Sequence, residues 1–139
     1  YTTCSGKNVD FVKSLGADQV IDYTKDDWAA VLKDKNLDCV FDTVGQAGTA
    51  EKAVDVLKEN GTIKAIMGGS KEPLPRGITF EFFLTNSNNF EDLDTLKTLI
   101  ESDKMKLPVQ ETFPLDGIAD AFKLSMSGRV VGKVGLKVS

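Results

Sequence analysis

Two residues near the start of the sequence, Ser5 and Lys7, offer a hydroxyl and an ammonium group two positions apart. Both groups donate hydrogen bonds, and the ammonium carries a positive charge, so the pair suits a phosphate group. No acidic residue stands between Tyr1 and Asn8, where a carboxylate would repel a phosphate. A solvated lysine beside a helix cap has the same appearance. The pair is therefore a candidate phosphate site that needs support from the rest of the chain.

A second candidate follows the short apolar run Cys39-Val40-Phe41, which leads directly into the residues 42–45. Such a run beside a helix pattern predicts a parallel strand buried on both faces. In open α/β sheets ligands bind just outside the carboxyl ends of these strands, so 42–45 is expected at a cofactor crevice. Another expected strand, 62–67, ends similarly in Gly68-Gly69. Asp42 itself is better interpreted as a carboxylate that satisfies backbone groups than as a catalytic acid.

Glycine-rich phosphate motifs give only a weak signal. Gly45-Gln46-Ala47-Gly48 is a G-x-x-G turn ahead of a helix pattern, which plain turn chemistry also explains. No G-x-G-x-x-G motif occurs anywhere in the 139 residues.

The sequence contains no histidine. Catalysis by Ser-His-Asp or Cys-His arrangements, and the usual zinc sites, are therefore excluded from this chain. The two cysteines, Cys4 and Cys39, have no disulfide or metal-ligand spacing and are expected to be reduced thiols of a cytoplasmic protein. We expect no metal site.

Composition narrows the class of protein further. Seventeen basic and 21 acidic residues leave a net charge of −4 without a basic cluster, which argues against a nucleic-acid or anionic-membrane surface. No apolar run approaches the roughly 20 residues that span a bilayer. The length fits one domain or part of one, and the start, Tyr1-Thr2-Thr3-Cys4, resembles a cut edge rather than a signal peptide.

Strand and helix patterns alternate along nearly the whole chain. Apolar residues at helical spacing predict helices over 9–15, 28–32, 50–57, 93–100 and 118–126. Short β-favouring runs predict strands at 1–3, 19–23, 39–41, 62–67, 78–84, 107–109 and 133–138. This alternation predicts an α/β protein with a mostly parallel sheet, and helices are expected on both faces.

At this point the sequence resembles a known family. Lys7-Asn8, the segments 13–18 and 20–23, Phe41-Asp42-Thr43-Val44-Gly45, Gly61-Thr62-Ile63 and Gly132-Lys133-Val134 follow the order seen in the medium-chain dehydrogenase/reductase superfamily. Within it the chain is most similar to the zinc-independent quinone and enone reductases, including zeta-crystallin-like proteins. The resemblance covers nearly all 139 residues and implies a Rossmann-like domain.

The resemblance also implies an NADPH-dependent reductase that acts on quinones or α,β-unsaturated carbonyls, with a homodimer expected. In dinucleotide-binding folds an acid after the second strand selects NAD, and Ser5 and Lys7 stand in that region here. Position by position, the implied cofactor contacts fall into four groups: Ser5, Lys7 and Tyr23 at the 2′-phosphate; Val44, Gly45, Met67, Gly68 and Gly69 in the flanking turns; Phe83, Leu84 and Thr85 beside the nicotinamide; and Lys133 near the C-terminus. Tyr23 as a packing residue and Phe83 as a core residue remain alternatives.

The chain departs from the family in what it lacks. The N-terminal catalytic domain, the first Rossmann strand and the glycine-rich pyrophosphate turn have no counterpart, so residues 1–139 are expected to form a partial nucleotide-binding domain. In the parent strand order 3-2-1-4-5-6 the lacking strand is the central one. The sequence thus informs on cofactor choice, but it leaves open whether the protein is a reductase or a non-catalytic, crystallin-like NADPH-binding protein.

Overall fold

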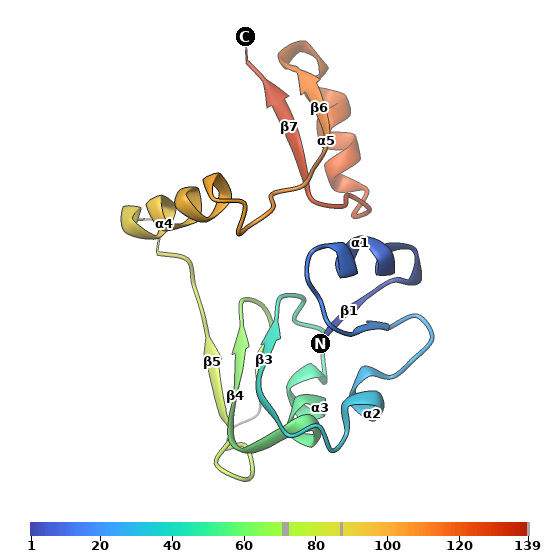
Figure 1. Ribbon diagram of the computed structural model, residues 1–139, viewed down its shortest axis with the longest axis vertical. Coiled ribbons are helices and arrows are strands. Elements are labelled where there is room, and N and C mark those ends of the chain that lie inside the picture. The colour runs from blue at the N-terminus through green and yellow to red at the C-terminus, as the bar shows by residue number, and fades with distance from the viewer. Residues whose placement is uncertain (71–72, 87, 139) are drawn as a thin grey trace. The chain divides into compact units, whose positions relative to one another are not determined.

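The computed structural model describes residues 1–70, 73–86 and 88–138, which belong to two compact units, 1–86 and 87–139 (Figure 1). The first unit contains β1 (Thr2–Cys4), the 3₁₀ helix η1 (Gly6–Asn8), α1 (Val9–Ser14), β2 (Val20–Asp22), α2 (Trp28–Leu32), β3 (Leu37–Asp42), α3 (Thr49–Val56), β4 (Leu57–Ala65) and β5 (Thr79–Phe82). The second contains α4 (Phe90–Glu101), β6 (Val109–Pro114), η2 (Leu115–Gly117), α5 (Ile118–Met126) and β7 (Lys133–Lys137).

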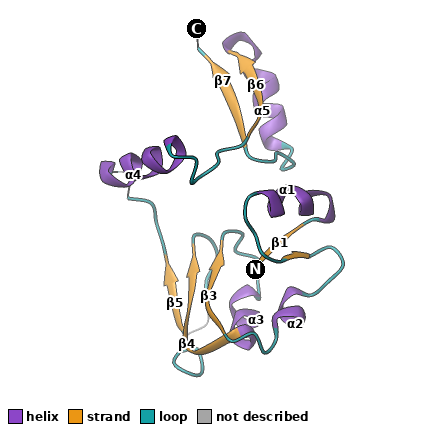
Figure 2. Cartoon of the chain, in the orientation of Figure 1, coloured by secondary structure: helices purple, strands orange, loops and turns teal. Residues whose placement is uncertain are grey.

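Strands and helices alternate as the sequence predicts, and every strand pair of the described residues is parallel (Figure 2). The strand orders are β1-β2, β3-β4-β5 and β6-β7. Parallel neighbours joined through helices are the βαβ arrangement of Rossmann-like folds. The predicted α/β class with a parallel sheet is confirmed.

In the first unit β1 pairs only with β2, and β3 pairs only with β4, among the residues that the structure describes. The other edges of β1 and β3 are therefore not joined to each other. This is the place where the family resemblance puts a central strand that has no counterpart in the chain.

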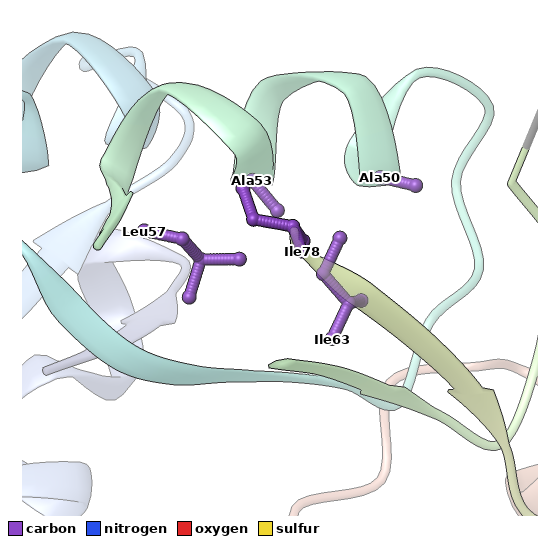
Figure 3. Packing of buried hydrophobic residues seen from close by; sticks show 5 residues of the cluster. All are labelled: Ala50, Ala53, Leu57, Ile63 and Ile78. Atoms are coloured by element: carbon purple, nitrogen blue, oxygen red, sulfur yellow. The ribbon is translucent and has the colours of Figure 1, made fainter. Parts of the chain in front are cut away.

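The main core lies between α3 and the β3-β4-β5 sheet (Figure 3). Ala50 and Ala53 of α3 are buried against Ile63 of β4, and their small side chains allow the helix to approach the sheet closely. Leu57 and Ile78 complete the cluster. Burying one Leu or Ile side chain stabilises the fold by about 1.5–3 kcal/mol, so this contact fixes α3 on the strands whose carboxyl ends carry the candidate site.

The start of α2 is stabilised by a carboxylate. Asp27 is the N-cap, and its side chain accepts a hydrogen bond from the Ala29 amide at 3.1 Å. Side-chain oxygens at this position satisfy one of the amides that a first helical turn leaves unpaired. Ala29 and Leu32 then pack with Ile21 and Val56 in a second buried cluster, whereas Val31, predicted on the apolar face, is 44% exposed.

Burial of β3 differs from the prediction. Phe41 is 62% exposed and Cys39 is exposed, whereas Val40 and Asp42 on the opposite face are half-buried. Side chains alternate between the two faces of a strand, so α3 covers one face of β3 and the other face is bare within the first unit. The expectation that this strand is buried on both faces is wrong for residues 1–86, since a continuous apolar run does not show what covers each face.

Several boundaries also differ. The strand predicted at 107–109 is β6, which runs from Val109 to Pro114. The helix predicted through Leu57 ends at Val56, because Leu57 opens β4, pairs with Leu37 and is almost completely buried there. Tertiary packing overrides the helical spacing of its side chain. Asp116 lies within η2, and Gly117 is the N-cap of α5.

The helices within the described residues are too short and too polar to cross a lipid bilayer.

Candidate functional site

The pairing of β1 with β2 brings Ser5 and Tyr23 close together. Cys4 and Asp22 are register partners at the ends of the two strands, and the Tyr23 amide donates to the Cys4 carbonyl at 3.1 Å. Ser5 and Tyr23 are the next residue of each strand. Lys7 follows in η1, where it is exposed and where the Asn8 amide closes the turn onto the Ser5 carbonyl at 2.9 Å. Residues that carry a hydroxyl, a phenol and an ammonium therefore lie in or next to one turn.

A residue that the sequence did not single out, Asp22, lies beneath this turn. Its Oδ1 accepts hydrogen bonds from the Thr24 amide at 3.0 Å and the Thr24 hydroxyl at 2.6 Å. Its Oδ2 lies so close to Gly6 that a Cβ on that glycine would stand 2.4 Å away. The Thr24 hydroxyl is the largest cause that lowers the pKa of Asp22 below its usual range, and Lys25 and the Gly6 backbone also contribute. The side chain is thus a carboxylate at neutral pH.

The turn after β3 is held by Asp42. Its Oδ1 accepts the Val44 amide at 2.8 Å and the Gly45 amide at 2.9 Å. This is the backbone-satisfying role expected from the sequence, and a side chain engaged in this way organises the turn. Val44 is left 76% exposed at its tip.

The glycines of two neighbouring turns touch each other. Gly45 has a φ of 69° and Gly68 a φ of 81°. A Cβ on Gly45 would stand 2.7 Å from the Gly68 nitrogen, and a Cβ on Gly68 would stand 2.9 Å from the Gly45 Cα. Only glycine fits at either position, so the chain presents two bare backbone turns side by side at the carboxyl ends of β3 and β4. Met67, which precedes Gly68, is 56% exposed, and a Cβ on Gly69 would meet no atom within 4 Å.

A groove of about 880 Å³ joins the two ends described so far. Its lining includes Thr2 and Thr3 of β1, Tyr23 after β2, and Phe41 and Val44 from β3 and its turn. The family resemblance puts the central strand at this position, so the groove corresponds to the place of that strand and not to a cofactor cleft. Tyr23 and Val44 line the groove where they follow the carboxyl ends of β2 and β3.

The third predicted segment continues β5. The Phe83 amide donates to the Ala65 carbonyl at 2.8 Å, which prolongs the pairing with β4 by one residue. Phe83 and Leu84 are 57% and 73% exposed, and Thr85 is also exposed. These residues leave the sheet at the same end as the two glycine turns, because β3, β4 and β5 are parallel. The alternative that Phe83 is a core residue is wrong for the first unit.

Lys133 lies in the other unit. It is the first residue of β7, and its amide donates to the Pro108 carbonyl at 2.9 Å. The structure describes the two units separately, so the predicted contact of Lys133 with the same cofactor stays a prediction.

A signal for Asp22 is present in the sequence, since a carboxylate that ends a strand is visible without a structure. What the sequence does not show is that strand pairing places it against Gly6.

Metal-ligating side chains do not cluster in the part of the chain that the structure describes. Within residues 1–70, 73–86 and 88–138 there is no group of three or more His, Cys, Asp or Glu side chains able to hold a metal ion.

Comparison with known proteins gives a consistent result. The family described as "Zinc-binding dehydrogenase" matches residues 15–136. The chain is 40% identical over 135 residues to a 2-methylene-furan-3-one reductase of Solanum lycopersicum, and 39% identical over 134 residues to an NADPH-dependent alkenal/one oxidoreductase, chloroplastic, of Arabidopsis thaliana. These matches cover 96% and 95% of the chain but 31% and 32% of the relatives.

A solved structure, the quinone oxidoreductase from Coxiella burnetii, superposes on 99% of the chain with a TM-score of 0.79 and 28% identity, and the chain spans 44% of it. The chain thus spans about a third to under a half of the length of these proteins. The paired strands, the glycine turns and these matches point to one conclusion. The chain belongs to the zinc-binding dehydrogenase family, which confirms its resemblance to the medium-chain dehydrogenase/reductase superfamily.

Proposed function

We propose that residues 1–139 are the cofactor-binding portion of an NADPH-dependent oxidoreductase that reduces quinones or α,β-unsaturated carbonyls. The observation that carries the proposal is the contact between the bare turns of Gly45 and Gly68 at the carboxyl ends of β3 and β4. Ser5 and Tyr23 follow the ends of the paired strands β1 and β2. The names of the tomato, Arabidopsis and Coxiella relatives supply the reaction class. The reaction of the whole protein is part of the proposal, since the chain spans less than half of each relative.

The residues fit a dinucleotide. Backbone can approach a phosphate or a ribose closely where side chains are absent, and the contact between Gly45 and Gly68 offers such a surface. Ser5, Lys7 and Tyr23 supply three hydrogen-bond donors, one of them charged, which suits a 2′-phosphate. The cofactor in this proposal is accordingly NADPH.

These groups indicate what the cofactor and the chain would each contribute to the reaction. Bound NADPH would supply the hydride from its nicotinamide ring. The chain's own residues bind and orient it: Lys7 and its neighbours hold one end, and the turns after β3 and β4 flank the middle. The exposed Phe83 and Leu84 provide apolar surface beside the ring and limit access of water. Positioning of this kind, rather than covalent chemistry, is what a protein contributes to hydride transfer.

The proposal is tested with the full-length protein. NADPH oxidation is followed with an enone, with a quinone and without acceptor, and NADPH binding is measured in parallel. We expect binding together with acceptor-dependent oxidation of NADPH. Binding without oxidation by either acceptor class would instead identify a non-catalytic NADPH-binding protein. Absence of binding would refute both assignments.

We also propose a homodimer and a cytoplasmic location. β5 has one partner strand in the described sheet, and it exposes Phe82 at this edge, which favours pairing with a second copy. Light scattering of the full-length protein would show a dimeric mass, and a monomer at micromolar concentration would contradict the dimer. Both cysteines are free thiols, which supports a reducing compartment. Imaging of the tagged full-length protein tests the location, and a signal confined to an organelle would contradict it.

A further inference from the structure

Asp22 occupies a position that the proposed phosphate site does not explain. It ends β2 opposite Cys4, so its side chain lies beside the turn that carries Ser5, Gly6 and Lys7. A carboxylate near a phosphate is unfavourable by charge alone. Its presence under a turn that we propose to bind phosphate therefore requires another reason.

The geometry supplies one. The side chain is only 11% exposed, and Oδ1 is held by the amide and hydroxyl of Thr24. This leaves Oδ2 directed at Gly6, cut off from solvent and without a hydrogen bond of normal geometry from the described residues. The nearest cation, the Lys25 ammonium, is 3.7 Å away and largely exposed.

A dry carboxylate oxygen is costly unless donors face it. The Gly6 backbone is the group that can compensate it, and it adds to the lowering of the pKa of Asp22. The positions of the Asp22 carboxylate and of the turn therefore depend on each other. Oδ2 of Asp22 needs the Gly6 amide nearby, and Gly6 has no room for a side chain because this oxygen lies beside it.

We propose that Asp22 is a positioning residue for the 2′-phosphate site, which it serves by holding Gly6 so that Ser5 and Lys7 flank the phosphate. The inference rests on the proposed function. It predicts that Asp22 favours NADPH binding although its own charge repels the phosphate.

This produces two opposite expectations for Asp22→Asn. If Asp22 acted only through its charge, the variant would bind NADPH more tightly. If Asp22 positions the turn, the variant binds NADPH more weakly. A side-chain amide whose oxygen still accepts hydrogen bonds from Thr24 points its own N–H donors at the Gly6 N–H, and two donors cannot bond to each other. NADH lacks the 2′-phosphate, so its binding reports on the rest of the site.

The test measures dissociation constants of NADPH and NADH for the full-length protein and for Asp22→Asn. The matched control is Asp10→Asn, which removes an equal charge from an exposed position on α1. We expect Asp22→Asn to weaken NADPH binding about tenfold and to leave NADH binding nearly unchanged. Asp10→Asn should change neither affinity.

Equal or tighter NADPH binding by Asp22→Asn would overturn the inference, and so would a parallel loss of NADH affinity. If Asp22→Asn does not fold, Thr24→Val carries the test, since it removes the hydroxyl that orients Oδ1. It should also weaken NADPH binding selectively, and unchanged discrimination would overturn the inference. A wild-type protein that does not prefer NADPH would instead refute the proposed cofactor, which distinguishes the two failures.

Discussion

Two separate requirements favour glycine at position 45. Its φ of 69° is in the left-handed region, and its backbone is in contact with that of Gly68 in the next turn. A left-handed conformation costs an L-residue about 1–2 kcal/mol, and overlap with a neighbouring backbone adds to this cost. Some other glycines of the chain meet only the first requirement. Gly16, for example, has a φ of 101°, but a Cβ at this position would meet no atom within 4 Å.

Gly45→Ala should therefore destabilise the protein more than Gly16→Ala does. We expect a loss of about 2 kcal/mol or more for Gly45→Ala, against about 1 kcal/mol for Gly16→Ala. Urea unfolding of the full-length variants measures both values. If the two losses are equal, the contact between Gly45 and Gly68 contributes nothing to stability.

At the scale of elements, the start of α2 shows how one side chain serves two contacts. Asp27 accepts the Ala29 amide and also binds the Lys52 ammonium of α3 at 3.1 Å. The hydrogen bond from Lys52 is the largest cause that lowers the pKa of Asp27, followed by the one from the Ala29 backbone. A carboxyl group with a lowered native pKa contributes stability that is complete above its unfolded pKa and is lost as the pH falls through its native pKa.

Asp27→Ala should consequently lower the thermal midpoint at pH 7 by more than Lys52→Ala, which keeps the helix cap. The difference between wild type and Asp27→Ala should shrink below about pH 3, where the wild-type carboxyl is also protonated. Circular dichroism melts at both pH values measure this. A difference that stays constant down to pH 2 would show that the charge of Asp27 has no role.

Sequence patterns predicted the elements well wherever local chemistry decides them. The turn role of Asp42 is such a local feature, and the structure confirms it. The failures concern contacts between distant segments. Leu57 leaves its helix because it packs in a strand, Phe41 is exposed because one face of β3 is bare in its unit, and Asp22 reaches Gly6 only through strand pairing. Periodicity contains no information on any of these three.

For the whole molecule, the central feature is that the predicted cofactor contacts follow the carboxyl ends of strands, with Tyr23 after β2 and Val44 after β3. The family is described as zinc-binding, yet this chain has no histidine. Zinc sites in enzymes are built mainly from His and Cys ligands. The chain therefore cannot supply such a set from its own residues, and hydride transfer in the proposed reaction needs none.

We predict that the full-length protein is a metal-independent reductase. Exhaustive chelation should leave the rate of acceptor-dependent NADPH oxidation unchanged, because cofactor position and not a Lewis acid supports the transfer. The control is a known zinc enzyme treated in the same way. Activity that disappears on chelation and returns with zinc would contradict this prediction.

We propose that the turn after β1 selects NADPH, and the affinities for NADPH and NADH test this selection. They are measured by titration of the full-length protein, Lys7→Ala and, as a control, Lys13→Ala, which removes an exposed lysine from α1. One charge-assisted contact is worth about 1.5–3 kcal/mol, so we expect the wild-type protein to bind NADPH more tightly than NADH by roughly 10- to 150-fold. Lys7→Ala should lose most of this preference with NADH binding unchanged, and Lys13→Ala should keep it. Equal affinity of the wild-type protein for NADPH and NADH would show that the turn after β1 does not select NADPH.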